Sequence, residues 1–203
     1  MGIYKEGNKE IHLKIVYWGS ENSGKTENIL KLSEILKYKG EIITLSTEEG
    51  KTIYFDFFSP TVSLQNGVKV KFLLYTSSGR KNAEANRGLV IDGTDGIVFV
   101  VDSEKDRIKD NKDSFEELKT VLKKKNLENI PIIVQYNKRD LPSALPVEVL
   151  RKELELEGYE EVEAIAKDGK GVEETFKKIA KLSLKAFLKK IQLKEEDLGN
   201  CCS

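Results

Sequence analysis

Eight consecutive residues near the beginning of the chain have the types and spacing of a phosphate-binding loop. They read G-S-E-N-S-G-K-T, from Gly19 to Thr26, and match the pattern G-x-x-x-x-G-K-[ST]. The glycines let the backbone wrap a phosphate without a Cβ in the way, so that successive N–H groups and a helix N-terminus point at the anion. In such a loop Lys25 reaches the β- and γ-phosphates, and the Thr26 hydroxyl is a ligand of Mg²⁺. The alternative is a glycine-rich turn beside a solvated lysine.

This loop predicts a nucleotide site but leaves the base open, because ATPases and small-molecule kinases share the pattern. The residues expected to contact the phosphates and the ion are Glu21, Asn22, Ser23, Gly24, Lys25, Thr26 and Glu27.

A second motif, N-K-R-D at Asn137 to Asp140, follows a predicted strand and could read the base. An aspartate carboxylate can accept two hydrogen bonds, from the ring N–H and the exocyclic amine of guanine. Adenine offers no such pair of donors and would leave the Asp140 charge desolvated and unpaired. Lys138 can lay its aliphatic stem along the base, and Asn137 can tie this loop to the phosphate loop. The alternative for four such residues is a plain polar turn.

A third segment, E-A-I-A-K at Glu163 to Lys167, follows the last short strand. The Ala166 amide could bind the guanine carbonyl there, and Lys167 is expected to line the same site.

Hydrophobic runs and helical patterns alternate along the chain, which predicts a mostly parallel sheet covered by helices on both faces. The predicted strands span residues 11–18, 53–58, 68–75, 96–101 and 131–136, and the predicted helices span 24–38, about 111–126, 146–156 and 171–191. Asn66-Gly67, a dipeptide favoured in tight hairpin turns, lies between the second and third of these strands and predicts that they are antiparallel neighbours. Gly40 is expected to stop the first helix. The base motif then falls at the carboxyl end of a strand, where ligands bind in open α/β sheets.

The 203 residues contain 34 basic and 34 acidic side chains, so the net charge is zero. No overall positive field is then present to hold nucleic acid, and an anion site must be built locally. The length predicts one domain. The sequence has no run of about 18 apolar residues and no apolar secretory stretch at its start, so we expect a cytoplasmic protein.

With these motifs in this order, the chain resembles the Ras-like small GTPases over residues 11 to about 190, and it is most similar to the MglA-type GTPases of prokaryotes. The segments that carry the closer likeness are K-I-V-Y-W-G, T-I-Y-F-D-F, F-L-L-Y-T-S-S-G, G-T-D-G-I-V-F-V-V-D-S and I-V-Q-Y-N-K-R-D-L-P-S-A-L-P-V-E-V-L-R. The resemblance implies the Ras-like P-loop GTPase fold, with a mostly parallel six-stranded sheet, one antiparallel edge strand and helices on both faces. It also implies a switch that binds GTP or GDP with Mg²⁺, a regulatory protein of the roadblock/longin type and an effector.

The switch segments depart from the pattern of the Ras-like family. That family usually has D-x-x-G after the third strand, followed by a glutamine that orients the attacking water. Here the segment is T-S-S-G-R, in which Thr76 replaces the aspartate, Gly79 keeps the glycine and Arg80 replaces the glutamine. The same resemblance makes Thr52 a second Mg²⁺ ligand and places Lys51 where MglA-type proteins have an arginine thought to act as a built-in finger. Lys51 and Arg80 are thus the candidate catalytic residues, although lysine lacks the planar fork of arginine.

Glu21 occupies the phosphate-loop position that in most relatives is a small residue close to the γ-phosphate. A carboxylate within about 4 to 6 Å of phosphate oxygens would be repelled by a few kcal/mol. We hypothesise that Glu21 pairs with Arg80 or Lys51 and holds the site closed to water until a regulator separates them. The alternative is that all three charges are solvated.

Residues 1–191 are predicted to form the GTPase domain, and residues 192–203 a flexible tail that contains Cys201 and Cys202. Rab-type small GTPases end in paired cysteines that carry prenyl chains, and two chains are what stable anchoring requires. The alternative is an unmodified tail, and only lipidation would bring the protein to a membrane.

Three functions fit these observations. The first is a molecular switch that hydrolyses GTP slowly on its own and needs a partner for turnover. The second is a GTP-locked binding scaffold with negligible hydrolysis, which Arg80 and Glu21 both permit. The third is an ATP-using phosphotransferase, against which Asp140 argues.

Overall fold

The structure is a computed structural model, and it describes residues 2–5, 9–38, 43–46, 52–57, 59–63, 67–77 and 84–200. At 43–46, 52–57, 84–87 and 192–200 only the backbone is described.

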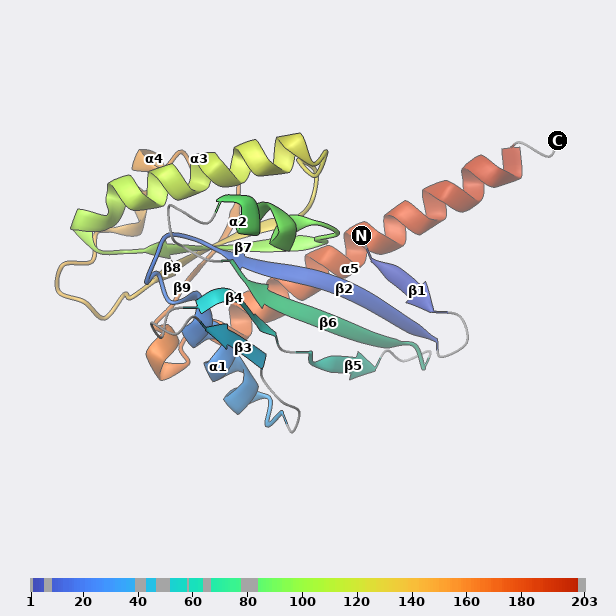
Figure 1. The fold of residues 1–203 in the computed structure, drawn as a ribbon, viewed down its shortest axis with the longest axis horizontal. Helices are drawn as coiled ribbons and strands as arrows, with labels where there is room; N and C mark the ends of the chain where they lie inside the picture. The colour runs from blue at the N-terminus through green and yellow to red at the C-terminus, as the bar shows by residue number, and fades with distance from the viewer. Residues whose placement is uncertain are drawn as a thin grey trace.

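A central sheet of seven strands, counted within the described residues, runs through the molecule (Figure 1). Its strands are β1 (Ile3–Lys5), β2 (Glu10–Trp18), β5 (Thr61–Ser63), β6 (Lys69–Thr76), β7 (Gly96–Asp102), β8 (Ile132–Asn137) and β9 (Glu160–Glu163). The order is β5-β6-β2-β7-β8-β9, and β1 pairs with β2. The four pairs from β6 to β9 are parallel, whereas β1 and β5 are antiparallel to their neighbours. The predicted fold class is confirmed, with one strand and one antiparallel pair more than expected.

The predicted hairpin across Asn66-Gly67 pairs different strands from those expected. The strand before this connection is β5, and it pairs with β6 so that Val62 lies opposite Val70. The strand predicted at 53–58 is β4 (Thr52–Phe57), and its described ladder is an antiparallel one with β3 (Ile43–Ser46). Strands β4 and β6 do lie beside each other, as expected. The prediction lacked β5, because that strand is only three residues long and carries no hydrophobic run typical of a strand.

Helices cover both faces of the sheet. On one face lie α1 (Lys25–Ile35) and α5 (Val172–Asn200), and on the other lie α2 (Glu84–Ile91), α3 (Ile108–Lys124) and α4 (Val147–Glu153) (Figure 1). Alternation along β2 explains the two layers, because Leu13 and Ile15 pack toward α1 and α5 while Val16 and Trp18 pack toward the other three helices. All seven residues of β7 are buried, as expected of a central strand covered on both faces.

Two helix ends differ from the prediction. Helix α1 ends at Ile35, and Lys37 then adopts the left-handed conformation with φ of 49° while the Tyr38 N–H donates to the Ser33 carbonyl. This pattern closes a helix without glycine, and Gly40 lies outside the described residues. Helix α5 continues to Asn200 rather than ending near residue 191, and it extends beyond the sheet in Figure 1.

Candidate functional site

The phosphate loop joins the end of β2 to the start of α1. Gly19 is forced by crowding, because a Cβ there would lie 2.3 Å from the Val100 carbonyl oxygen. Gly24 has φ of 99°, and a Cβ on it would lie 2.2 Å from Nδ2 of Asn137. Only glycine fits both positions, so the spacing of the motif follows from its packing.

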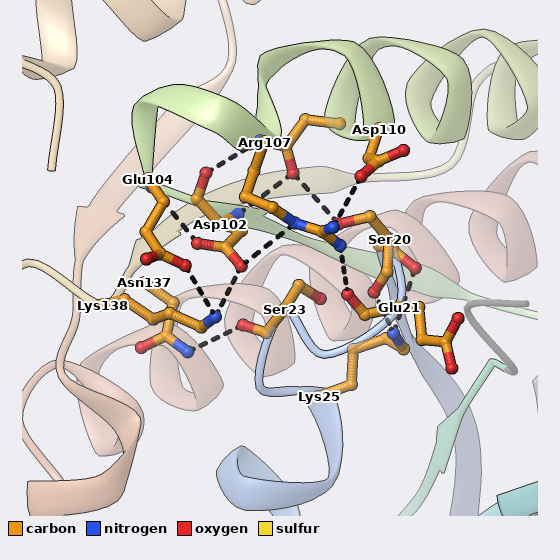
Figure 2. Close-up of polar contacts among 12 residues, drawn as sticks. Ser20, Glu21, Ser23, Lys25, Asp102, Glu104, Arg107, Asp110, Asn137 and Lys138 are labelled. Carbon is orange, nitrogen blue, oxygen red and sulfur yellow. Dashed lines mark hydrogen bonds and ion pairs between the residues drawn. The ribbon is translucent and has the colours of Figure 1, made fainter. Parts of the chain in front are cut away.

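Lys25 lies inside the curve of this loop. Its Nζ donates to the carbonyl oxygens of Gly19 and Ser20, at 3.0 and 2.6 Å, and the residue is 7% exposed. Carbonyl oxygens hold the ammonium beside the N-terminus of α1 (Figure 2). A positive charge and a helix N-terminus at one place form a site for an anion.

Asn137 joins the base motif to the phosphate loop. Its Nδ2 donates to the Ser23 carbonyl at 2.8 Å, and its Oδ1 accepts the Ala166 N–H at 2.9 Å. The side chain is buried, and it connects three loops that follow the carboxyl ends of β2, β8 and β9. The three motifs found in the sequence therefore meet at one edge of the sheet.

A cavity of about 250 Å³ lies between these loops. Its lining residues are Gly24, Glu27, Asn137, Lys138, Asp140, Leu141, Ile165, Ala166 and Lys167. Seven of these lining residues, all except Leu141 and Ile165, were predicted to bind the nucleotide. Leu141 and Ile165 were not predicted, and they supply apolar surface suited to the faces of a planar base.

Asp140 and Lys167 form an ion pair at this cavity. Lys167 donates to the Asp140 carboxylate, and this contact holds the pKa of Asp140 below its usual value and raises the pKa of Lys167. Asp140 is therefore ionised at neutral pH, in the state that accepts hydrogen bonds from a base. Arg139, between the two lining residues 138 and 140, anchors the loop instead, because its guanidinium donates to the Leu145 carbonyl at 2.6 Å.

Lys138 adopts a left-handed backbone conformation with φ of 64°. Its Nζ lies 2.6 Å from Oδ2 of Asp102 and 3.5 Å from Oε2 of Glu104. The Asp102 side chain is fully buried at the end of β7, and it holds the ammonium of this cavity-lining lysine. A strained backbone held by an ion pair is a feature found at functional sites.

Arg107 links this ion pair to the phosphate loop (Figure 2). It follows β7 in a short 3₁₀ helix, Lys105–Arg107, and its Nη2 donates to the Glu21 carbonyl at 2.7 Å. Its Nη1 lies 2.6 Å from Oδ2 of Asp110, and its Nε lies 3.7 Å from Oδ2 of Asp102. Arg107 therefore holds the backbone of Glu21, whose carboxylate points away from the guanidinium in Figure 2.

Asp102 and Arg107 were not among the residues predicted for this site. A signal was present, because Asp102 follows the buried run G-I-V-F-V-V and so reaches the same edge of the sheet as Asn137. Arg107 carried no comparable signal, since nothing in its sequence neighbourhood indicates a partner 86 residues away.

Several predicted residues cannot be placed. Lys51, Gly79, Arg80, Cys201 and Cys202 lie outside the described residues, and of Thr52 only the backbone is described, at the start of β4. The proposed pairing of Glu21 with Arg80 or Lys51 therefore stays a prediction.

The comparisons with known proteins agree with this geometry. The model of the ADP-ribosylation factor family matches residues 2–183. The chain is 40% identical to the mutual gliding-motility protein MglA of Myxococcus xanthus over 91% of this chain and 96% of the relative. It is 28% identical to the Ras-related protein Rab-5B of Plasmodium falciparum, over 87% of this chain and 80% of that one, and 30% identical to the ADP-ribosylation factor-like protein 2 of Drosophila melanogaster, over 76% of each. This chain belongs to the Arf/Ras-like small GTPases.

Thr76 of this small GTPase ends β6 at the edge where the loops meet. It lies opposite Tyr17 in the parallel ladder and is 2% exposed. The segment that follows is anchored at its start, because the Ser77 N–H donates to the Tyr17 carbonyl at 2.9 Å. The small GTPase has no helix, in the part of the chain that was described, with the length and apolar character needed to cross a bilayer.

Proposed function

We propose that this small GTPase is a molecular switch that binds GTP and GDP with Mg²⁺ and hydrolyses GTP slowly on its own. The observation that carries the proposal is the cavity between Asp140, the Ala166 amide and the phosphate loop, with Lys25 inside that loop. The family generally binds guanine nucleotides, and this cavity has the donors, the acceptor and the charge that such a ligand requires.

Guanine would be selected by Asp140. The ring N–H and exocyclic amine of guanine would replace Lys167 as donors to its carboxylate. The Ala166 N–H, which donates to Oδ1 of Asn137 in this structure, would be shared with the guanine carbonyl. Adenine presents no matching pair of donors, so if it displaced Lys167 the Asp140 carboxylate would be left unpaired. An unsatisfied buried group costs about 1 to 3 kcal/mol, and a charged one costs more. The same argument weighs against an ATP-using phosphotransferase.

The residues near the phosphate loop fit Mg²⁺. Thr26 lies in the first turn of α1 and offers a hydroxyl oxygen beside the expected phosphates, and Thr52, the second predicted ligand, begins β4. Mg²⁺ prefers oxygen ligands and takes the remainder from phosphates and water. When bound, the ion would neutralise charge that develops on the phosphate oxygens.

Slow intrinsic turnover and the need for a partner are proposed from the switch residues. Arg80 stands in place of the glutamine that positions water, and Lys51 in place of an arginine. A roadblock/longin-type protein would complete the site, and an effector would recognise the GTP-bound form. The second candidate is a GTP-locked scaffold, which Arg80 and Glu21 also permit. Hydrolysis measured with and without the partner separates the two, because the scaffold would stay inactive in both conditions.

We propose a cytoplasmic location, with attachment to a membrane only if Cys201 and Cys202, which follow α5 in the sequence, carry lipid. Mass spectrometry of the protein from its native host would detect such chains.

The nucleotide retained after purification tests the central proposal. We expect chromatography of the denatured protein to release GDP or GTP at close to one equivalent. A competition measurement should then show displacement of a fluorescent guanine nucleotide by GTP and not by ATP. Displacement by ATP, or no binding of either nucleotide with Mg²⁺ present, would contradict the proposal.

A further inference from the structure

Two buried amide side chains face each other beneath the phosphate loop. Asn28 lies in the first turn of α1, and Gln135 lies in β8, 107 residues along the chain. Nδ2 of Asn28 donates to Oε1 of Gln135 at 2.8 Å, and Nε2 of Gln135 donates to Oδ1 of Asn28 at 2.8 Å. Both residues are 0% exposed, so this reciprocal pair is shielded from water.

The pair extends to the two loops that would hold the nucleotide. Nδ2 of Asn28 also donates to the Gly24 carbonyl at 2.9 Å, at the end of the phosphate loop. On the other side, Nε2 of Gln135 donates to Oγ1 of Thr175 at 2.9 Å, and that hydroxyl donates to the Gly171 carbonyl at 2.7 Å. Gly171 follows the segment that carries Ala166. One chain of hydrogen bonds therefore runs from the phosphate loop to Gly171. Gly171 in turn packs against the start of the base-reading segment, because a Cβ on it would lie 2.2 Å from the Glu163 carbonyl oxygen.

The surroundings of this chain are apolar. Ile29 and Leu32 of α1 and Ile133 of β8 belong to the same core layer, and Phe176 follows Thr175 in α5. Apolar side chains of similar size could fill such a place without any fixed direction, whereas amide pairs bond in few orientations. The polar pair therefore fixes one alignment of α1 against β8, where a purely apolar contact would allow several.

We propose that Asn28 and Gln135 are positioning residues for the nucleotide, holding Gly24 and the Ala166 segment at the spacing that one bound guanine nucleotide spans. They act below Asn137, which touches both loops directly. Loss of the alignment lets the two loops separate, and the nucleotide leaves faster. This inference rests on the proposed function, because it assigns a role within the same site.

The test is the dissociation rate of a fluorescent GDP analogue from the full chain carrying both Asn28→Leu and Gln135→Met. The double substitution removes both amides together and leaves neither one buried without its partner, so the fold is retained. We expect release about tenfold faster than from the wild-type protein, equivalent to about 1.4 kcal/mol. ATP should still fail to compete, because Asp140 is unchanged.

A purely structural role is excluded by a destabilised control. Phe72→Leu shortens a core side chain of β6 that packs edge-on against Phe176 with ring centroids 5.4 Å apart, and it lowers the free energy of unfolding without touching any amide. We expect it to release the analogue at the wild-type rate. Equal acceleration in Phe72→Leu and in the double variant would overturn the proposal, as would a folded double variant with the wild-type release rate.

Thr175→Val provides the second variant, and it decides the question if the double variant does not fold. Thr175→Val keeps the side-chain shape and removes the hydroxyl. Its matched control is Ser183→Ala, which removes a buried hydroxyl eight residues further along α5, where Ser183 lies against Gly96 at the other end of the sheet. We expect about threefold faster release from Thr175→Val and no change from Ser183→Ala. Wild-type release from Thr175→Val would overturn the proposal. If the wild-type protein itself bound neither GDP nor GTP, the proposed function would fail instead.

Discussion

The side chains that hold the phosphate loop differ in charge and in burial between its two sides. Toward α3, Arg107 donates to the Glu21 carbonyl and pairs with Asp110, and these two charged side chains are 29% and 31% accessible. One neutral, buried contact lies on this side as well, from Oγ of Ser20 to Oδ1 of Asn111 at 3.2 Å. Toward α1, β8 and α5 the contacts are neutral and buried, through Asn28, Gln135 and Asn137. We call these the ionic side and the amide side.

The ion pairs on one side are weaker and more easily rearranged than the buried amide hydrogen bonds on the other. Exposed ion pairs contribute about 0 to 1 kcal/mol and weaken as salt screens them. Buried amide pairs lose about 1 to 3 kcal/mol when one partner is left unsatisfied. The amide side therefore sets the geometry of the site, and the ionic side can rearrange when a phosphate or a charged partner approaches Glu21.

The largest expected effect lies at Asp140 and sets the scale for both sides. Asp140→Asn replaces a carboxylate that accepts two hydrogen bonds by an amide that accepts one and donates one. The new amide N–H then faces the exocyclic amine of guanine, and two donors cannot form a hydrogen bond. Xanthine has a carbonyl at that position, which accepts from the amide. We expect GTP affinity to fall by about 100-fold or more, with a preference for xanthine nucleotides, measured by competition against a fluorescent nucleotide.

Retained guanine preference in Asp140→Asn would show that another group reads the base. The smaller changes in affinity expected on the two sides could then not be ranked against the loss of base recognition.

The next largest effect is expected on the amide side. Asn137→Ala leaves the Ser23 carbonyl and the Ala166 N–H buried without this partner. We expect a loss of about 2 to 4 kcal/mol in the free energy of unfolding and GDP affinity about 30-fold lower, by denaturant titration and calorimetry. Both losses should be the same at low and high salt, since no charge is removed. A strong salt dependence would break the distinction between the sides.

A smaller effect is expected on the ionic side. Arg107→Gln removes the guanidinium from Asp110 and weakens the hold on the Glu21 carbonyl, while Asp102 keeps Lys138. We expect GDP release about threefold faster at about 0.05 M KCl, and the wild-type rate should approach the variant rate near 1 M. A constant ratio of the two rates at every salt concentration would contradict this account.

The smallest effect is expected at Lys167, whose pair with Asp140 is exposed. The pair holds the folded pKa of Asp140 below its unfolded value, so it stabilises the empty protein above the unfolded pKa, near 4, and this contribution is lost as pH falls through the folded value. We expect Lys167→Gln to change GDP affinity less than about twofold. Its deficit in urea midpoint should be constant from pH 5 to 7, shrink as the pH falls below about 4 and disappear once the pH is below the folded pKa of Asp140. A deficit that grows in acid would reverse the sign of the linkage.

The sequence predicted the loops of the site better than the contacts that hold them. Both loop motifs can be identified in the sequence because all their functional residues are close together in the chain: G-S-E-N-S-G-K-T and N-K-R-D. Both lie at the carboxyl edge of the sheet, as expected. Gln135 lies inside a buried strand, and no residue near it in the sequence indicates its partner. Asn28 likewise has no sequence feature that distinguishes it from other helix positions. Their meaning depends on a register between α1 and β8 that no local pattern encodes.

Fold elements followed the same rule. Buried strands such as β7 carry strong hydrophobic runs and were predicted within one residue of their ends. Strand β9 reads E-E-V-E with only Val162 buried, and α2 contains Gly88, so local preference gave no bounds for either. Pairing partners at the edge of the sheet depended on β5, a strand too short to show alternation.

The close approach of Gly24 to Asn137 also limits how this protein can change over evolution. Since any side chain at position 24 would strike the amide that supports the base loop, phosphate affinity cannot be tuned there without disturbing base recognition. A library that randomises position 24 alone should return only glycine, and viable exceptions should carry a compensating change at position 137. The two loops are thus inherited as one unit.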